Sequence, residues 1–364
     1  MKTEHEGIKR PRRSQSLWMT LGVISGLAVV AVGYQFMPHH DPVRVKAWDK
    51  IKPRLEQTDK ATQKEVTAST AQVQQFFAQR KPFARRFAAD CLSLSGKWAY
   101  LKGCFSAGSH QRHLEECFER NIFGSGELKA IIKSAVSRYV SEIQGQENQL
   151  LVAIRVDLEG SELADPKYLP ALGSESEFRR EYDAMLEKVI PILTKDLGMT
   201  VTREVVAFIG AEIATQLLME IGVSLATELG ISGGILGTGA YSGTFTFGVG
   251  LVAGILVDMT LDWVIRQAGY DPEGEIAAKV LVTLERLERL VLEGDQQTKE
   301  RYASAKWKTW SLSASGRQAA WAEVRSIESS GGLGLNHQLN RINEVRSRLR
   351  EEALKGLILK GNTQ

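Results

Sequence analysis

The side chains best suited to chemistry in this sequence are the thiols and imidazoles between residues 91 and 117. On a helix, His110, His113 and Cys117 occupy positions i, i+3 and i+7, which share one face. A zinc ion takes four such ligands. The candidate metal set is therefore Cys104, His110, His113 and Cys117. Its spacing matches no common zinc module, so the signal for a metal is weak.

Two further interpretations of the cysteines stay open, a disulfide and unpaired buried thiols. Cys104 and Cys117 could bridge across a turn near Gly108. Cys91 and Cys104 could not bridge if one helix carries both, because thirteen residues of helix rise about 20 Å.

A second group of polar and ionisable residues recurs at four-residue spacing on both sides of a glycine-rich stretch. Its members are Glu212, Gln216, Glu220, Ser224 and Glu228 before the stretch and Asp258, Asp262 and Arg266 after it. Helical bundles that bind two metal ions use Glu-x-x-His motifs on paired helices. None is found here, so the sequence favours a solvated stripe on otherwise buried helices.

No catalytic motif follows from the remaining residues. The sequence has no zinc-protease helix motif and no Walker lysine, and its repeated GxGxxxG lacks a preceding strand. We therefore expect no enzyme and no cofactor. Trp307, Trp310 and Trp321 are interpreted as packing residues. The arginines between residues 341 and 350 are interpreted as a solvated face, with anionic lipid or an acidic partner as the alternative.

The stretch from Gly230 to Val257 holds no charged residue and repeats GxGxxxG at an offset of eleven, close to three helical turns. The repeated glycines are Gly237, Gly239, Gly243, Gly248, Gly250 and Gly254. Glycine is a poor helix former, so a helix tolerates this many only where other backbones pack closely against it. We expect this stretch and residues 205–229 to form a central helical hairpin.

A membrane anchor is predicted at the start of the chain. Leu17 to Phe36 is uncharged and long enough to cross a hydrocarbon core of about 30 Å. Arg10, Arg12 and Arg13 precede it, which places the N-terminus in the cytoplasm and the body in the periplasm of a bacterial inner membrane. A cleaved signal peptide is the alternative interpretation.

A dimer face within this anchor is suggested by Gly22 and Gly26, which form a GxxxG pair.

Composition narrows the classes of partner. The chain has 364 residues and a formal net charge of +3. The first fourteen residues carry that whole excess, so the body is neutral in sum and is not expected to bind nucleic acid. Because no segment alternates with period two, the predicted fold class is all-α.

The predicted organisation divides the chain at its proline- and glycine-rich breaks, including Pro42 and Pro53, and we expect a glycine-serine hinge at residues 329–334. The predicted regions are a basic tail (1–14), the transmembrane anchor (15–37), a polar spacer with one helix (38–81), a helical region containing the cysteines (82–160), a helical core with the glycine-rich hairpin (174–270) and C-terminal amphipathic helices (271–364).

Two functions are consistent with this organisation. The first is a membrane-anchored α-helical scaffold or adaptor that acts through contact with a partner protein or by self-association. The second is a membrane-inserting, pore-like protein in which residues 205–257 enter the bilayer. Glu212 and Glu220 would each cost about 3 kcal/mol near the middle of a bilayer, which favours the scaffold.

Overall fold

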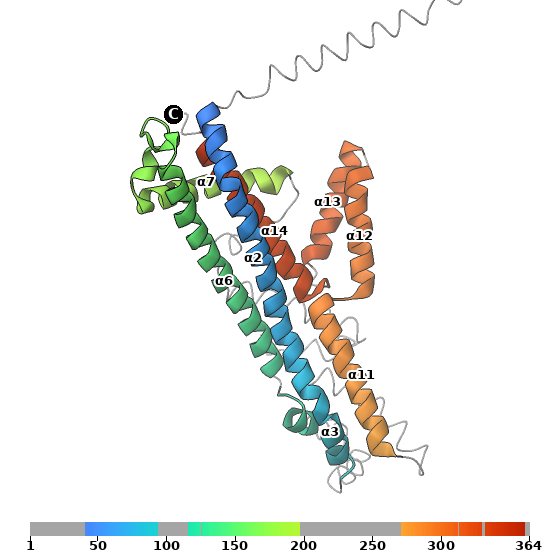
Figure 1. The fold of residues 1–364 in the computed structure, drawn as a ribbon. Helices are drawn as coiled ribbons and strands as arrows, with labels where there is room; N and C mark the ends of the chain where they lie inside the picture. The colour runs from blue at the N-terminus through green and yellow to red at the C-terminus, as the bar shows by residue number, and fades with distance from the viewer. Residues whose placement is uncertain are drawn as a thin grey trace, which may run out of the picture.

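The computed structural model describes residues 41–93, 116–124, 126–196, 271–311, 313–329 and 332–360. Every regular element in these ranges is helical, which confirms the all-α prediction for them (Figure 1). None of the helices described is long and apolar enough to cross a membrane. The predicted anchor with Gly22 and Gly26, and the predicted hairpin with its six repeated glycines, lie outside the described residues.

The longest element is α2 (Pro42–Arg80), which forms the axis of the molecule (Figure 1). Asp41 is its N-cap, with Oδ1 accepting a hydrogen bond from the Val43 amide at 2.9 Å. The predicted spacer is wrong here, because Pro42 begins the helix instead of breaking it, as proline does at the first helical position. Pro53 lies inside the helix on its exposed side, between the buried residues Ile51 and Leu55.

The partner of α2 along its length is α6 (Glu127–Glu159), which runs antiparallel to it (Figure 1). Apolar residues follow one stripe of α6, from Leu128 through Tyr139 and Ile143 to Leu158, and all four are buried. This stripe has the 3.6-residue period of an amphipathic helix. Tyr139 also donates a hydrogen bond from its hydroxyl to the Leu339 carbonyl at 3.1 Å.

Two further helices pack beside α2. α11 (Pro272–Glu293) packs against α2 and α3 (Ala84–Cys91), and α14 (Gly334–Lys355) packs against the N-terminal half of α2. A short 3-10 helix, η1 (Lys81–Phe83), joins α2 to α3. As predicted, the apolar stripe of α11 is buried, and so are Leu339, Ile342, Val345 and Leu349 of α14.

One end of the bundle is closed by α7 (Glu175–Asp196), the 3-10 helices η2 (Glu162–Ala164) and η3 (Pro170–Gly173), and the π-helical turn η5 (Gly356–Lys360). Ser174 caps α7, with its Oγ accepting a hydrogen bond from the Glu177 amide at 3.1 Å. Pro191 does not end this helix, which continues to Asp196.

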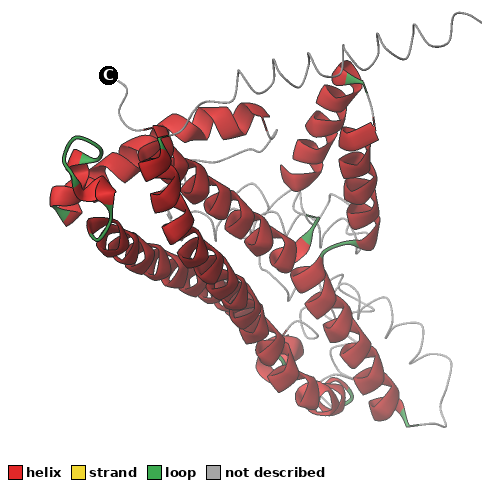
Figure 2. Ribbon diagram, turned by 45° about the horizontal axis from the view of Figure 1, so that its top comes forward, coloured by secondary structure: helices red, strands yellow, loops and turns green. Residues whose placement is uncertain are grey.

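A hairpin of α12 (Gln296–Ser311) and α13 (Ala314–Ser329) projects from the bundle (Figures 1 and 2). We call it the arm. Its own small core contains Ala305, Val324, Ile327 and Leu333. At its base the Asp295 amide donates a hydrogen bond to the Gly332 carbonyl at 2.8 Å. The part of the expected glycine-serine hinge that the structure describes is therefore packed against the loop that follows α11.

Candidate functional site

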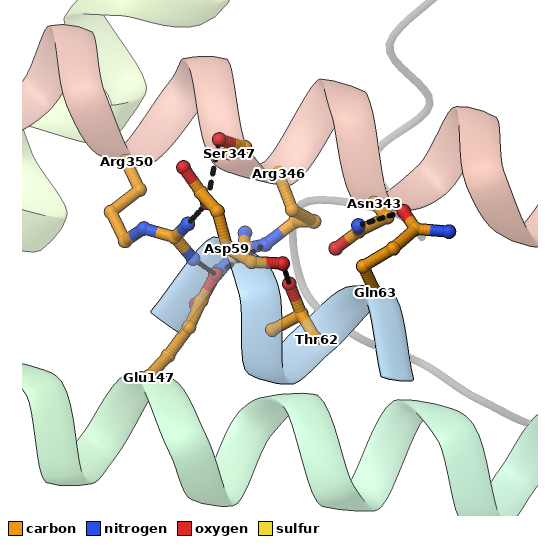
Figure 3. A network of polar contacts seen from close by, with 8 residues as sticks. All are labelled: Asp59, Thr62, Gln63, Glu147, Asn343, Arg346, Ser347 and Arg350. Carbon is orange, nitrogen blue, oxygen red and sulfur yellow. Dashed lines mark hydrogen bonds and ion pairs between the residues drawn. The ribbon is translucent and has the colours of Figure 1, made fainter. Parts of the chain in front are cut away.

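The core of the bundle is divided into two apolar clusters by a layer of charged side chains. One cluster contains the C-terminal half of α2, α3, the N-terminal half of α6 and α11, and the other contains the remaining halves of α2 and α6 together with α7. Between them lie Glu147 of α6, Arg346 and Arg350 of α14, and Asp59 of α2 (Figure 3). We call these four residues the charge layer.

Three members of the charge layer are almost fully buried. Glu147, Arg346 and Arg350 are 5%, 4% and 2% exposed, which is rare for charged side chains. Arg346 forms an ion pair with Glu147 through Nη2, and its Nε lies 3.3 Å from Oε1 of the same carboxylate. Arg350 lies 3.3 Å from Glu147 through Nη1.

Arg350 also pairs with a partly exposed carboxylate, that of Asp59. Nη2 of Arg350 pairs with Oδ1 of Asp59, which in turn accepts a hydrogen bond from the Ser347 hydroxyl at 2.8 Å. Two guanidinium groups thus face two carboxylates, so the layer is neutral in sum. The layer corrects the prediction that the last helix presents a solvated arginine face, since Arg346 and Arg350 point inward. Arg348 is exposed and pairs with Glu344 at 2.9 Å, as that prediction expected.

The edge of the charge layer forms the floor of a groove between α2 and α14. The groove has a volume of about 670 Å³, and every residue that lines it is polar or charged. Its lining residues are Asp59, Lys60, Gln63, Lys64, Asn340, Asn343, Glu344, Ser347 and Arg348. Pockets for small molecules are mostly apolar with a few polar groups, so this groove does not resemble one.

Amide side chains bridge one end of the groove. Gln63 donates a hydrogen bond to Asn340 at 2.8 Å and accepts one from Asn343 at 3.2 Å (Figure 3). Lys60 and Lys64 are exposed, one helical turn apart on α2, and no ion pair is found for either among the residues described. The groove therefore offers amides at one end and positive charge along the α2 edge.

The base of the arm holds a second buried polar group, on α13 and α14. Glu328 forms an ion pair with Arg341 at 2.8 Å and accepts a hydrogen bond from the Tyr302 hydroxyl at 3.1 Å. The Tyr302 ring meets the His337 imidazole edge-on, with ring centroids 4.8 Å apart. Burial raises the pKa of Glu328, while burial and the neighbouring cations Arg341 and Lys306 lower the pKa of His337 to about 4.

His337 should therefore make stability depend on pH. The unfolded chain protonates this histidine near pH 6.5, whereas the folded protein does so only near pH 4, so its contribution is complete above pH 6.5 and is lost as pH falls toward 4. We expect the difference in melting temperature between the wild type and His337→Gln to shrink across that interval. Subtraction cancels the opposite effect of Glu328. A difference that stays constant with pH would contradict a buried neutral His337.

Two tryptophans of the arm lie where the sequence interpretation did not place them. Trp307 and Trp310 on α12 are 72% and 80% exposed, so the prediction that they are packing residues is wrong. Trp321 on α13 is half-buried against the core of the arm, as predicted. The tryptophans therefore divide into one that packs and two that face outward.

The two cysteines that the structure describes form no disulfide, which agrees with the interpretation of buried thiols. Cys91 at the end of α3 is hydrogen-bonded to Cys117, which lies in a short helix at 116–121. That hydrogen bond and burial raise the pKa of Cys91. Asn121 links the same two segments, since its Nδ2 donates to Asp90 Oδ2 at 2.9 Å and to the Cys117 carbonyl at 2.8 Å.

The candidate metal set remains a prediction, because Cys104, His110 and His113 lie outside the described residues. Within the part of the chain that the structure describes, no three His, Cys, Asp or Glu side chains gather as metal ligands would. The stripe of carboxylates from Glu212 to Asp262 also lies outside it.

The fold and the groove together define an all-helical protein with a projecting helical arm and a polar, partly basic contact surface. Comparison with known protein families, with curated proteins and with solved structures gives no match. The function must therefore be inferred from the residues of this chain.

Proposed function

We propose that the protein is a membrane-tethered α-helical scaffold of the bacterial envelope, which acts by binding a partner protein in the groove between α2 and α14. The observation that carries this proposal is that every residue lining the groove is polar or charged. Residues 15–37 serve as the tether, and the body lies on the periplasmic side. A groove with no apolar side chain in its lining is poorly suited to a small apolar ligand, whereas polar rims are typical of contacts between proteins.

The charge of the groove indicates the chemistry of the partner. Lys60 and Lys64 stand along one edge, while Gln63, Asn340 and Asn343 present amides that accept and donate hydrogen bonds. A segment with acidic and amide side chains fits this surface. The buried charge layer beneath holds α2 and α14 in register, so the two walls of the groove keep a fixed spacing.

The test is to reverse the charge of the groove edge. Full-length protein carrying Lys60→Glu and Lys64→Glu is expressed, membranes are chemically crosslinked, and the size of the crosslinked complex is measured. We expect the complex to disappear in this variant. Lys129→Glu and Lys133→Glu on α6 form the matched control, because these lysines are also exposed and one turn apart. Equal loss in both variants, or in neither, would refute binding in the groove.

Self-association is a distinct result of the same experiment. If the crosslinked complex contains only this chain, tagged and untagged copies co-purify, and the partner is a second copy of the protein. The scaffold proposal fails if carbonate washing releases the full-length chain from membranes, because the tether is then absent.

A further inference from the structure

Trp307 and Trp310 form an exposed aromatic face near the end of α12. Their spacing of three residues places both rings on one side of the helix, and 72% and 80% of their surfaces are exposed. Large aromatic side chains at such exposure are typical of surfaces that another body covers. Trp310 is next to Ser311, where α12 ends, so the pair lies close to the tip of the arm.

The charge around the pair favours an anionic occupant. α12 carries four basic residues, Lys299, Arg301, Lys306 and Lys308, and a single acidic residue, Glu300. Lys306 lies over the Tyr302 ring at 5.6 Å, and Lys308 is 3.3 Å from a carboxylate oxygen of Glu323 on α13. Tryptophan beside lysine and arginine is the usual composition of a helix that lies in the headgroup region of a bilayer.

The position of the arm places this face on the membrane side of the body. The tip of the arm and the first turn of α2 lie at the same end of the molecule (Figures 1 and 2). The predicted anchor ends near Phe36, and only residues 37–41 separate it from α2. Five residues span at most about 18 Å, so an anchored chain holds this end of the body close to the bilayer.

The size of the exposed face also distinguishes a bilayer from a protein partner. Two tryptophans bury at most about 200 Å² each, whereas a stable contact between proteins buries about 800 Å² on each partner. A bilayer needs no matching surface, because single aromatic rings partition into the headgroup region one by one.

We propose that the arm docks through Trp307 and Trp310 onto the anionic lipid surface of the membrane that anchors the chain, and so fixes the orientation of the body. This inference depends on the proposed tether at residues 15–37, and the experiment separates the two.

The experiment uses full-length protein reconstituted in vesicles of phosphatidylethanolamine and phosphatidylglycerol, with or without bromine on the acyl chains to quench nearby tryptophans. Flotation on a density gradient reports the tether. The fraction of emission that brominated lipid quenches reports the docking of the arm, and it is compared between the wild type, Trp307→Phe/Trp310→Phe and Trp321→Phe.

The expected results for the two variants have opposite signs. The double variant removes two of the seven tryptophans, so if both touch lipid the quenched emission falls by about two sevenths of the total wild-type emission, and the quenched fraction falls with it. Trp321 is half-buried in the arm, so its replacement removes unquenched emission and raises the quenched fraction.

Protein that floats, with a quenched fraction that rises in the double variant, would overturn docking of the arm and leave the tether intact. Protein that does not float would overturn the tether itself, and docking with it. A spectral blue shift that depends on Trp307 and Trp310 in native membranes but not in these vesicles would identify a protein occupant and refute the lipid surface.

Discussion

Replacing Glu147 with alanine is expected to lower the free energy of unfolding by about 3–5 kcal/mol, because it leaves two buried arginines without their shared carboxylate. Of the carboxylates in the charge layer, Arg350 would keep the partly exposed Asp59, whose side chain is 43% accessible. Removing one partner of a buried ion pair costs far more than the pair contributes, since the remaining charge cannot be hydrated. Urea unfolding of the body followed by circular dichroism measures the change.

The matched control for Glu147 is Glu344→Ala on α14. Glu344 also pairs with an arginine, Arg348, but both side chains are nearly half exposed. Pairs of this kind at i,i+4 contribute only about 0.3–0.5 kcal/mol. If Glu147→Ala and Glu344→Ala shift the unfolding midpoint equally, the charge layer does not lie in the low-dielectric interior that the structure gives it.

A triple replacement tests separately whether the charge layer stabilises the fold and whether it fixes the position of α14 along α2. Exchanging Glu147, Arg346 and Arg350 together for apolar residues of similar volume leaves no buried unpaired charge, since the remaining Asp59 is 43% accessible, so we expect a cost near zero or a gain. The two apolar clusters would then merge along α2, and α14 would lose the buried ion pairs that fix its position along α2. We therefore expect the triple variant to be stable and yet to lose the crosslinked complex, because the groove walls would no longer be aligned.

The position of Glu147 in the sequence already indicated a buried charge. Glu147 follows Ile143 by four residues and precedes Leu150 by three, so it occupies a position of the apolar stripe of α6. Arg346 likewise stands four residues after the buried Ile342. A charged residue at a core position calls for a buried partner. Which helix supplies that partner depends on tertiary packing, and periodicity within one helix carries no information about it.

The two exposed tryptophans illustrate the opposite error. Trp307 and Trp310 were assigned to packing because of their size, but α12 buries a different stripe, through Tyr302, Ala305 and Thr309. Those three residues have helical spacing of three and four. Most side chains in this stripe are small, so a prediction based on the size of apolar side chains favours the wrong face of α12. Testing each tryptophan against the stripe of its own helix would have placed both outside.

Helix type and core stripes were predictable because they depend on local periodicity, as α6 and α11 show. Pro53 was misjudged for a local reason as well. A proline on the exposed side of a long helix removes one backbone hydrogen bond, at a cost of about 3 kcal/mol. Burial of Ile51 and Leu55 on either side, with the rest of the α2 stripe, offsets that cost. Propensity within one segment cannot anticipate this, because the compensation comes from α6 and α14.

Gly294→Ala is expected to destabilise the protein by at least about 3 kcal/mol, because the loops at the base of the arm meet backbone to backbone. Gly294 has φ of 81° and Gly334 has φ of 75°, both in the left-handed region that favours glycine. A Cβ on Gly294 would lie 2.6 Å from the Gly334 amide nitrogen and would overlap the Gly332 carbonyl. Neither neighbour is the flexible end of a side chain, so the loops must separate.

Gly145→Ala provides a control of opposite sign. Gly145 is exposed in the interior of α6, and no atom lies within 4 Å of the position that its Cβ would take. Alanine there should stabilise the protein by about 0.5–1 kcal/mol through helix propensity alone.

Thermal unfolding measures the changes in both variants, and hydrogen exchange shows where Gly294→Ala acts. In Gly294→Ala the amides of α12 and α13 should lose protection while those of α2 and α6 keep it, because among the described residues the arm is joined to the bundle through its base. A Gly294→Ala protein that unfolds at the wild-type temperature would mean that the arm has no such fixed joint, and the orientation it gives the body at a membrane would then have no structural basis.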